Sequence, residues 1–447
     1  MGQDIRGQMR TLFTMILVGT IAATAACGRT APATSEGSGD AQKTAAAQPS
    51  AWAPAIEPLA SPAGANTSEP QLMVSNTGVL LSWVENTETK AILKFAERTA
   101  SGWSEPRTAA SGEDWFLSWA DVPSVMRLND GTLFAEWLQA TNPDIEAYDL
   151  RLSYSKDNGT TWARSFTPHH DRTKTQHGFA SMLELPGSGV GIIWLDGRAT
   201  ETDTASPEGG AMGLRYATFD RNWKQTADMP IDGKVCDCCQ TSAGVTADGV
   251  IAAFRDRSDK EIRDIHVSRL ENGKWTPSSS VHDDNWMIPA CPVNGPAISA
   301  RGRTVAIAWF TVKNDQGEAY AAFSNDAGRS WGAPIRLDEK NASTGRVDIE
   351  LLEDGSAVAT WLEFVNQRAQ FRMRRVEPAG AASPPITIAD GSMGRTNGHP
   401  RIARHGDELV LAWTTSSSAD LPEGAGMLKV QTAVVRLPDA AAQNTTR

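Results

Sequence analysis

The segment Ser155-Lys-Asp-Asn-Gly-Thr-Thr-Trp162 returns later in the chain as Ser324-Asn-Asp-Ala-Gly-Arg-Ser-Trp331. An Asp side chain accepts backbone N–H bonds inside a tight turn, and Gly supplies the positive φ that such a turn requires. The Trp can then pack the turn against a neighbouring strand. Each segment therefore predicts a hairpin turn that joins two β-strands.

The two segments lie within a longer repeat that begins near residue 70. Each unit has a short apolar strand, a Gly turn and a second apolar strand that ends close to an aromatic residue. These aromatic residues, spaced 52 to 60 residues apart, are Trp83, Trp137, Trp194, Phe254, Trp309, Trp361 and Trp413. Repeats of this length, with about four short strands each, are typical of β-propeller blades. The sequence therefore predicts an all-β fold, a single β-propeller of four-stranded blades over residues 51–438.

The Ser-x-Asp-x-Gly-x-x-Trp segments resemble the Asp boxes, or BNR repeats, of the sialidase-like propeller superfamily. Degenerate copies occur at Ser101-Gly-Trp103 and at Glu271-Asn-Gly-Lys-Trp275. The resemblance covers essentially the whole folded chain and implies a propeller. Sialidases themselves have six blades, whereas this sequence shows seven repeats. We therefore prefer seven blades, with six as the alternative.

The last repeat offers only three strands, over PRIARH, ELVLAWTT and MLKVQTAVVR. The segment that begins at Trp52, WAPAIEP, is similar to the outer strands WSEPR and WTPSS of other repeats. We therefore expect the N-terminal segment to supply the missing outer strand and to close the ring.

Residues 1–26 have the features of a lipoprotein signal peptide. Arg6 and Arg10 precede the apolar run LFTMILVGTI, and small residues lead to Cys27. We expect lipidation at Cys27, with ordinary signal-peptide cleavage as the alternative. Residues 27–50 are small and polar and predict a flexible tether, and residues 439–447 predict a disordered tail. The expected location is the cell envelope, with the outer membrane favoured.

The composition excludes one class of partner. The net charge is −11, so the chain has no basic footprint for nucleic acid. The sequence predicts no cofactor and no metal ion, and it does not indicate an oligomeric state.

In a meandering blade, the loops that enter the innermost strand and the loops that leave the second strand lie on one face, which we call the top face. Loops over a rigid scaffold are where binding sites are built. An unusual number of basic and polar side chains falls in these loops. The residues that we expect to bind a glycan or an anionic small molecule are Arg198, Arg255, Arg346, Arg395, His177, His399 and Asn294.

Four cysteines fall in two neighbouring top-face loops: Cys236, Cys238 and Cys239 in one, Cys291 in the next. In an exported protein such a cluster predicts disulfides. Three pairings are possible, and we favour Cys291 bonded to one of the other three. The alternative is a thiolate metal site assisted by His177.

The resemblance to sialidases implies three arginines for a substrate carboxylate, a Tyr/Glu nucleophile and an Asp acid/base. This chain has Ser68-Glu69-Pro70 where the family has its Arg-Ile-Pro motif, and Tyr320 beside Glu318 is its only late tyrosine. A general glycoside hydrolase needs only two suitably placed carboxylates. The candidates are Asp196, Asp256, Asp348 and Glu363. Two hypotheses follow: an envelope-anchored exoglycosidase of the exo-α-sialidase kind, or a non-catalytic propeller that binds a glycan or a partner protein.

Overall fold

The computed structural model describes residues 52–142, 146–187, 189–200, 210–339, 343–365, 368–391, 395–416 and 427–437. The predicted signal peptide, Cys27, the tether and the C-terminal tail lie outside these residues. The described residues contain no α-helix, and therefore no helical segment that could cross a membrane.

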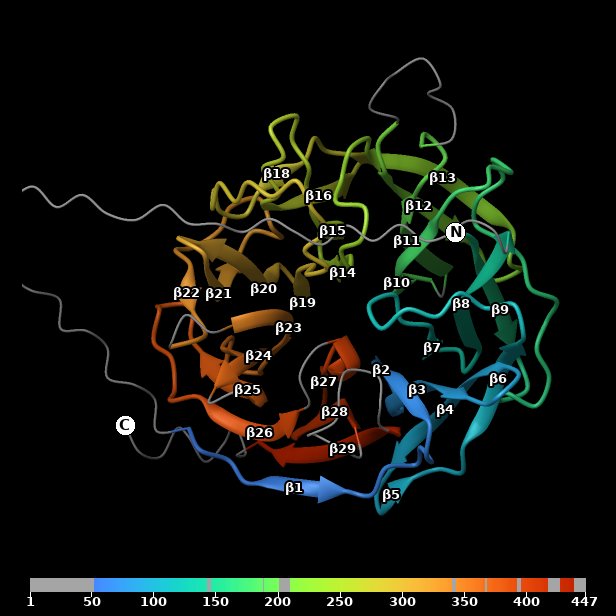
Figure 1. Ribbon diagram of the computed structural model, residues 1–447, viewed down its shortest axis with the longest axis horizontal. Coiled ribbons are helices and arrows are strands. Elements are labelled where there is room, and N and C mark those ends of the chain that lie inside the picture. The colour runs from blue at the N-terminus through green and yellow to red at the C-terminus, as the bar shows by residue number, and fades with distance from the viewer. Residues whose placement is uncertain are drawn as a thin grey trace, which may run out of the picture. The chain divides into compact units, whose positions relative to one another are not determined.

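Seven antiparallel sheets stand in a ring as the blades of a β-propeller (Figure 1), which confirms the predicted fold and the preferred number of blades. The innermost strands of the blades are β2 (Thr67–Ser75), β7 (Ser124–Arg127), β10 (His177–Leu185), β14 (Ser242–Thr246), β19 (Ala297–Arg301), β23 (Ser343–Leu351) and β27 (Arg401–His405). The second strands are β3 (Gly78–Asn86), β8 (Leu133–Asn142), β11 (Gly189–Asp196), β15 (Gly249–Arg255), β20 (Thr304–Lys313), β24 (Ala357–Val365) and β28 (Glu408–Ser416).

The outer half of each blade continues the same meander. The third strands are β4 (Ala91–Thr99), β9 (Ala147–Ser155), β12 (Gly213–Phe219), β16 (Ile265–Glu271), β21 (Gln316–Ser324), β25 (Arg368–Val376) and β29 (Leu428–Arg436). The outer strands are β5 (Gly102–Trp103), β6 (Arg107–Gly112), β13 (Gln225–Asp232), β17 (Lys274–Trp275), β18 (Ser279–Ser280), β22 (Ile335–Arg336) and β26 (Ile386–Gly391). The second blade has three named strands, and a single bridge from Leu152 to Phe166 stands in its outer position.

The ring is closed by the N-terminal strand β1 (Ile56–Leu59), which pairs with the C-terminal strand β29 (Figure 1). The seventh blade therefore has the order β1-β29-β28-β27, with both ends of the propeller in one sheet. Trp52, just before β1, is buried against this blade. The predicted closure by the N-terminal segment is confirmed.

The repeated aromatic residues form the core between blades. Six of the seven are buried, and Trp413 is half-buried against the seventh blade. Because each ring removes roughly 150–250 Å² from water, each contributes on the order of 4–6 kcal/mol of hydrophobic stabilisation. This explains why a large aromatic residue returns once per repeat.

The two Ser-x-Asp-x-Gly-x-x-Trp segments form hairpin turns on the face opposite the top face. In the first, the Asp157 carboxylate accepts the backbone N–H of Thr161 at 2.8 Å, and Gly159 has a φ of 83°. Hydrogen bonds from Thr161 and Ser155 lower the pKa of Asp157 to about 2. The Trp162 ring lies edge-on to Phe95. These contacts stabilise the turn and leave no role for it in binding at the top face.

Candidate functional site

The mouth of the axis on the top face is occupied by one aromatic ring and two arginines. Trp119 lies in the loop that enters β7. The guanidinium of Arg346 is 4.5 Å from the centre of the Trp119 ring, and that of Arg395 is 5.9 Å from it. His399 stacks on the same ring with centroids 5.6 Å apart. We call Trp119, Arg346, Arg395 and His399 the mouth cluster.

The backbone at Arg346 is bent to direct its side chain toward the mouth. Gly345 and Arg346 both have positive φ, 80° and 55°, within a bulge of β23. A Cβ at position 345 would lie 2.1 Å from the Asn294 Oδ1, so only Gly fits. Asn294 Oδ1 accepts the backbone N–H of Arg346 at 2.7 Å. A non-Gly residue in this conformation is uncommon, and such strain is typical of functional sites.

The mouth cluster draws on three blades. Arg346 donates through Nη1 to the carbonyl oxygen of Gly398 at 3.1 Å, which ties the sixth blade to the loop that enters the seventh. Gln240 donates to the carbonyl of Ala120 at 2.7 Å and holds the Trp119 loop from the fourth blade. Burial, followed by the charges of Arg401 and Arg346, holds the pKa of His399 well below its usual range. His399 is therefore a neutral ring at physiological pH.

Four of the seven predicted ligand-binding residues thus meet here: Arg346, Arg395, His399 and Asn294. Trp119 was not predicted. Its signal in the sequence was the aromatic run Trp115-Phe116-Leu-Ser-Trp119 in a top-face loop, which lies outside the repeat and has no counterpart in the other loops.

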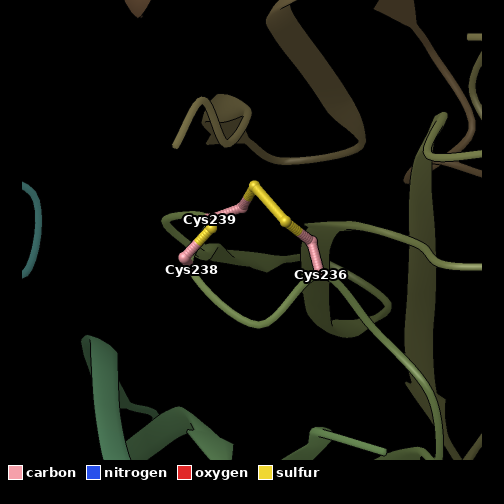
Figure 2. Close-up of side chains that lie close together, drawn as sticks. All are labelled: Cys236, Cys238 and Cys239. Atoms are coloured by element: carbon pink, nitrogen blue, oxygen red, sulfur yellow. A yellow bond between two sulfur atoms is a disulfide. The ribbon is translucent and has the colours of Figure 1, made fainter. Parts of the chain in front are cut away.

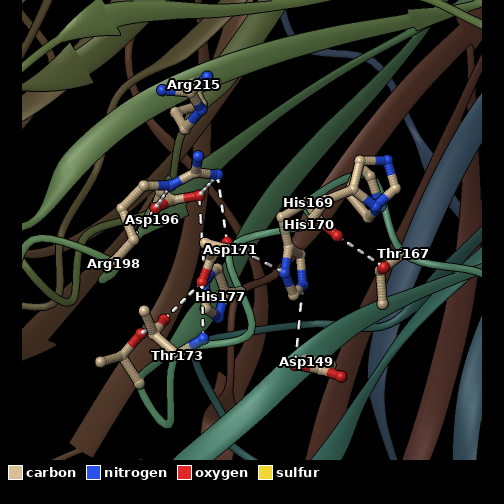
Figure 3. Close-up of polar contacts among 12 residues, drawn as sticks. Asp149, Thr167, His169, His170, Asp171, Thr173, His177, Asp196, Arg198 and Arg215 are labelled. Atoms are coloured by element: carbon tan, nitrogen blue, oxygen red, sulfur yellow. Dashed lines mark hydrogen bonds and ion pairs between the residues drawn. The ribbon is translucent and has the colours of Figure 1, made fainter. Parts of the chain in front are cut away.

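A second polar cluster lies between the second and third blades (Figure 3). Arg198 donates to both oxygens of Asp196, at 2.6 and 2.8 Å, and lies 3.3 Å from Asp171. Asp171 is also 3.3 Å from His177 and 3.5 Å from His169. The two imidazole rings stack with centroids 3.8 Å apart. Burial lowers the pKa of His169 to about 3.

This second cluster is packed inside the blade interface. His177 is fully buried, and Asp196 accepts an additional hydrogen bond from the Trp194 indole at 2.8 Å. Burial alone would raise the pKa of Asp196, but hydrogen bonds from Arg198 outweigh it and lower this pKa. An acid catalyst needs the opposite shift. Asp196 and Arg198 therefore form a structural ion pair at this site.

Arg255 is also enclosed by the fold. Its guanidinium donates to the backbone carbonyls of Asn294, Arg263 and Phe310 and lies 4.9 Å from the Trp286 ring. Burial lowers its pKa to about 9. Two of these bonds, to Asn294 and Phe310, join the fourth blade to the fifth, and the third, to Arg263, stays within the fourth blade.

The remaining carboxylate candidates are in three separate environments. Glu363 is buried and lies 3.7 Å from Arg372. Asp348 accepts backbone N–H bonds from Ile349 and Ile402, and burial raises its pKa. Asp256 lies 3.8 Å from His266, and its pKa is raised mainly by burial. Among the described residues, no hydrogen bond or ion pair joins any two of the four candidates.

Three other buried carboxyl groups lie near the axis: Glu69, Asp121 and Glu136. Burial, with the charge of Asp121 second, raises the pKa of Glu69 to about 8 and that of Glu136 well above its usual range. Burial likewise raises the pKa of Asp121 to about 7. None of the three forms an ion pair within the described part of the chain. None of the three was among the candidate site residues predicted from the sequence.

The structure forms two disulfides. Cys238 bonds to Cys291 and links the loops that enter β14 and β19, while Cys236 bonds to Cys239 within one loop (Figure 2). The first bond is of the kind that we favoured from the sequence, since Cys291 joins one of the three clustered cysteines. It ties the fourth blade to the fifth at the top face.

Comparisons with known proteins agree on the fold alone. No protein-family model matches the chain, and no curated protein matches it. Among solved structures, the polysaccharide lyase Uly1 aligns with a TM-score of 0.51 at 8% identity, over 83% of this chain and 90% of that one. A protein of unknown function from Dyadobacter fermentans aligns at 0.49 with 13% identity, over 86% and 97%. The NanB sialidase of Streptococcus pneumoniae aligns at 0.43 with 9% identity, over 80% and 83%.

Proposed function

We propose that this chain is a glycan-directed β-propeller that binds an acidic saccharide at the mouth of its axis. The observation that carries the proposal is the placement of Arg346 and Arg395 on the Trp119 ring. An indole offers a flat apolar face to the C–H groups of a sugar ring, and a guanidinium can bind a carboxylate or sulfate through two parallel hydrogen bonds. Trp119 and Arg346 are partly exposed and Arg395 is exposed, so a ligand can reach them.

The support around the mouth cluster favours binding. Asn294 holds the backbone of Arg346, and Gly398 accepts a hydrogen bond from its side chain, so little side-chain freedom is left to lose. Preorganisation of this kind reduces the entropic cost of binding. A saccharide ligand is also consistent with the propeller fold that the chain shares with a polysaccharide lyase.

Calorimetric titration of the full-length protein with oligosaccharides tests the proposal. Uronate-containing or sialate-containing oligosaccharides should bind, and neutral oligosaccharides of the same length should bind at least about tenfold more weakly. Arg346→Ala, Arg395→Ala and Trp119→Ala should each weaken binding of the acidic ligand. Arg303→Ala, an exposed arginine on the opposite face, is the matched control. Equal binding of acidic and neutral oligosaccharides, or binding that survives all three substitutions, would refute the proposal.

A second candidate function is glycoside hydrolysis, and Asp256 is the observation that favours it. Its pKa is raised and its side chain is 19% exposed, so it can hold a proton and still meet a substrate. The next residue, Arg257, lines a cleft of about 350 Å³ together with Lys174, Glu146 and Asp237. Turnover of fluorogenic glycosides, a sialoside included, that Asp256→Asn abolishes without lowering the melting temperature would establish the enzyme. Absence of turnover on every substrate leaves binding as the function.

We also propose that the propeller is held at the cell envelope through a lipid on Cys27. The positively charged start, the apolar run and the small residues before Cys27 support this. Mass spectrometry of the N-terminal peptide from cell membranes should find a diacylated cysteine. Cys27→Ser should release the protein from the membrane fraction, and an unmodified Cys27 in membrane-bound protein would contradict the proposal.

A further inference from the structure

The axis of the propeller contains a cavity of about 180 Å³ that is lined by residues from all seven blades. Its charged lining residues are Asp121, Asp348, Glu350 and Arg401. With all four ionised, the lining carries three negative charges and one positive charge. The lining includes no Cys and no His, so the side chains that face the cavity offer mainly oxygen atoms to a ligand.

The carboxylates of this cavity are held in place by the strands around them. Asp348 accepts the backbone N–H of Ile402 at 3.0 Å, and Glu350 accepts the hydroxyl of Ser299 at 3.0 Å. Asp121 accepts the backbone N–H of Phe179 at 2.7 Å through one oxygen. Its other oxygen, Oδ2, is buried and has no hydrogen-bond partner among the residues that the structure describes, and Asp121 is only 3% exposed.

Two further carboxyl groups lie close to Asp121, and neither forms an ion pair with another described residue. Glu69 and Glu136 are buried close enough to interact with Asp121, and the Oε2 of Glu69 also has no hydrogen-bond partner. An ionised carboxylate that is buried without a counter-charge is very costly. Such a group must either hold a proton, as the raised pKa of Asp121 and Glu350 reflects, or meet a cation.

We propose that the axial cavity binds one hydrated divalent cation of the Ca²⁺ type. Asp121 is a direct ligand, and Asp348 and Glu350 supply the further negative charge that balances the cation. Two positive charges balance the net charge of the lining. Ca²⁺ takes six to eight oxygen ligands in flexible geometry and accepts water among them. A cavity of this size has room for a cation and several water molecules. The absence of Cys and His from the lining disfavours Zn²⁺ and Cu²⁺.

A cation bound at Asp121 would affect the loop that carries Trp119 on the top face. Asp121 follows Trp119 by two residues, and the carbonyl between them is held by Gln240, which also lines the cavity. A cation at Asp121 would therefore fix the loop that carries the Trp119 ring. This inference is independent of the saccharide ligand, because it rests on the cavity alone.

The test uses the full-length protein after treatment with a chelator. Calorimetry at about pH 8 should show saturable binding of one Ca²⁺ per chain, and the melting temperature should rise with Ca²⁺ concentration, since a ligand that binds only the folded state stabilises it. Asp121→Asn should weaken Ca²⁺ binding at least about tenfold, because it removes a charged ligand. Asp228→Asn, an exposed carboxylate paired with Arg215, should bind Ca²⁺ like the unmodified chain.

Asp121→Asn replaces the carboxyl with a neutral group of the same shape. It removes an unpaired buried charge, so the cation-free variant should melt at or above the temperature of the unmodified chain. If this variant fails to fold, Glu350→Gln tests the same cavity from the sixth blade. The proposal is wrong if Ca²⁺ neither binds nor raises the melting temperature, if K⁺ at equal ionic strength gives the same rise, or if the folded Asp121 and Glu350 variants keep the full response.

Discussion

The guanidinium of Arg346 lies 4.5 Å from the centre of the Trp119 ring, although the two residues come from the sixth blade and from the loop that enters the second. The contact exists because the ring of blades brings all the innermost strands to one axis. It joins the aromatic ring at the mouth to an arginine whose backbone and side chain are both held by hydrogen bonds. The candidate site is therefore a product of ring closure.

Arg346→Lys should weaken binding of an acidic oligosaccharide about fivefold to tenfold. Lys keeps the charge, but it lacks the planar guanidinium that stacks on indole and binds a carboxylate with two donors. Calorimetric titration measures the loss, and Arg303→Lys on the opposite face serves as the control. Unchanged affinity in Arg346→Lys would mean that charge alone, and not the stacked geometry, determines binding.

Asp196→Ala should lower the free energy of unfolding by about 3–5 kcal/mol. The substitution leaves the buried Trp194 indole N–H without its acceptor and leaves Arg198 with Asp171 alone, and removal of one partner from a buried ion pair is strongly destabilising. Denaturant unfolding measures the change. Asp228→Ala removes the partner of Arg215 from a more exposed ion pair. This substitution should lower the free energy of unfolding by no more than about 1 kcal/mol. Equal costs for the two variants would contradict the structural role of Asp196.

The melting temperature should fall as the pH rises from about 6.5 to about 8, a range in which the buried His169 and His399 are neutral in the folded chain and largely neutral in the unfolded chain. The folded-state pKa of Glu69 is raised to about 8 by burial and by the charge of Asp121, and the pKa of Asp121 is raised to about 7. Between the unfolded-state pKa near 4.5 and these values, the folded chain holds protons that the unfolded chain releases, so stability is lost as the pH rises. Other groups that face this region are Glu136 and Tyr148.

Glu69→Gln should flatten this pH dependence, because the amide does not titrate. Thermal melts across the pH range, with a chelator present, measure the slope for both chains. Glu57→Gln, at a largely exposed position on β1, should retain the slope of the unmodified chain. A slope that is identical in Glu69→Gln would show that Glu69 titrates in the same way in the folded and unfolded chains.

The two disulfides should contribute unequally to stability. The bond between Cys238 and Cys291 spans 53 residues, whereas the bond between Cys236 and Cys239 spans 3. Loop-closure entropy predicts a cost of about 4 kcal/mol for loss of the long bond and about 2 kcal/mol for loss of the short one. Unfolding of the Cys238→Ser/Cys291→Ser and Cys236→Ser/Cys239→Ser double variants compares them directly. A larger loss in the second variant would exclude the entropic explanation.

The repeat determined most of the fold. A large aromatic residue in each second strand, Trp in six repeats and Phe in one, returns at a period near that of a blade and indicated both the propeller and its number of blades. The outer-strand pattern at Trp52 also indicated how the ring closes. These features are local, because each repeat carries its own turn and strand signals and packs mainly on its two neighbours.

The tertiary structure decided which of the predicted site residues are buried and which are exposed. Arg255 ends the second strand of its blade and Arg346 lies near the start of an innermost strand, and both were expected from the sequence to bind a ligand at the top face. The first is 2% exposed with every guanidinium nitrogen bonded to a carbonyl, and the second reaches the mouth through a left-handed turn. Their sequence contexts do not separate them. What separates them is the neighbouring blade, which covers one and leaves the other partly open.

Sequence alone thus established the propeller, its closure and the face on which polar loops gather, because periodic patterns report the contacts of a residue with its own repeat. Only the tertiary structure placed Trp119 over the axis and buried Glu69, Asp121 and Glu136 without counter-ions. Those features arise from side chains of different blades that meet around the axis, and the pKa of a carboxyl group depends on the solvent and charge that those blades leave around it.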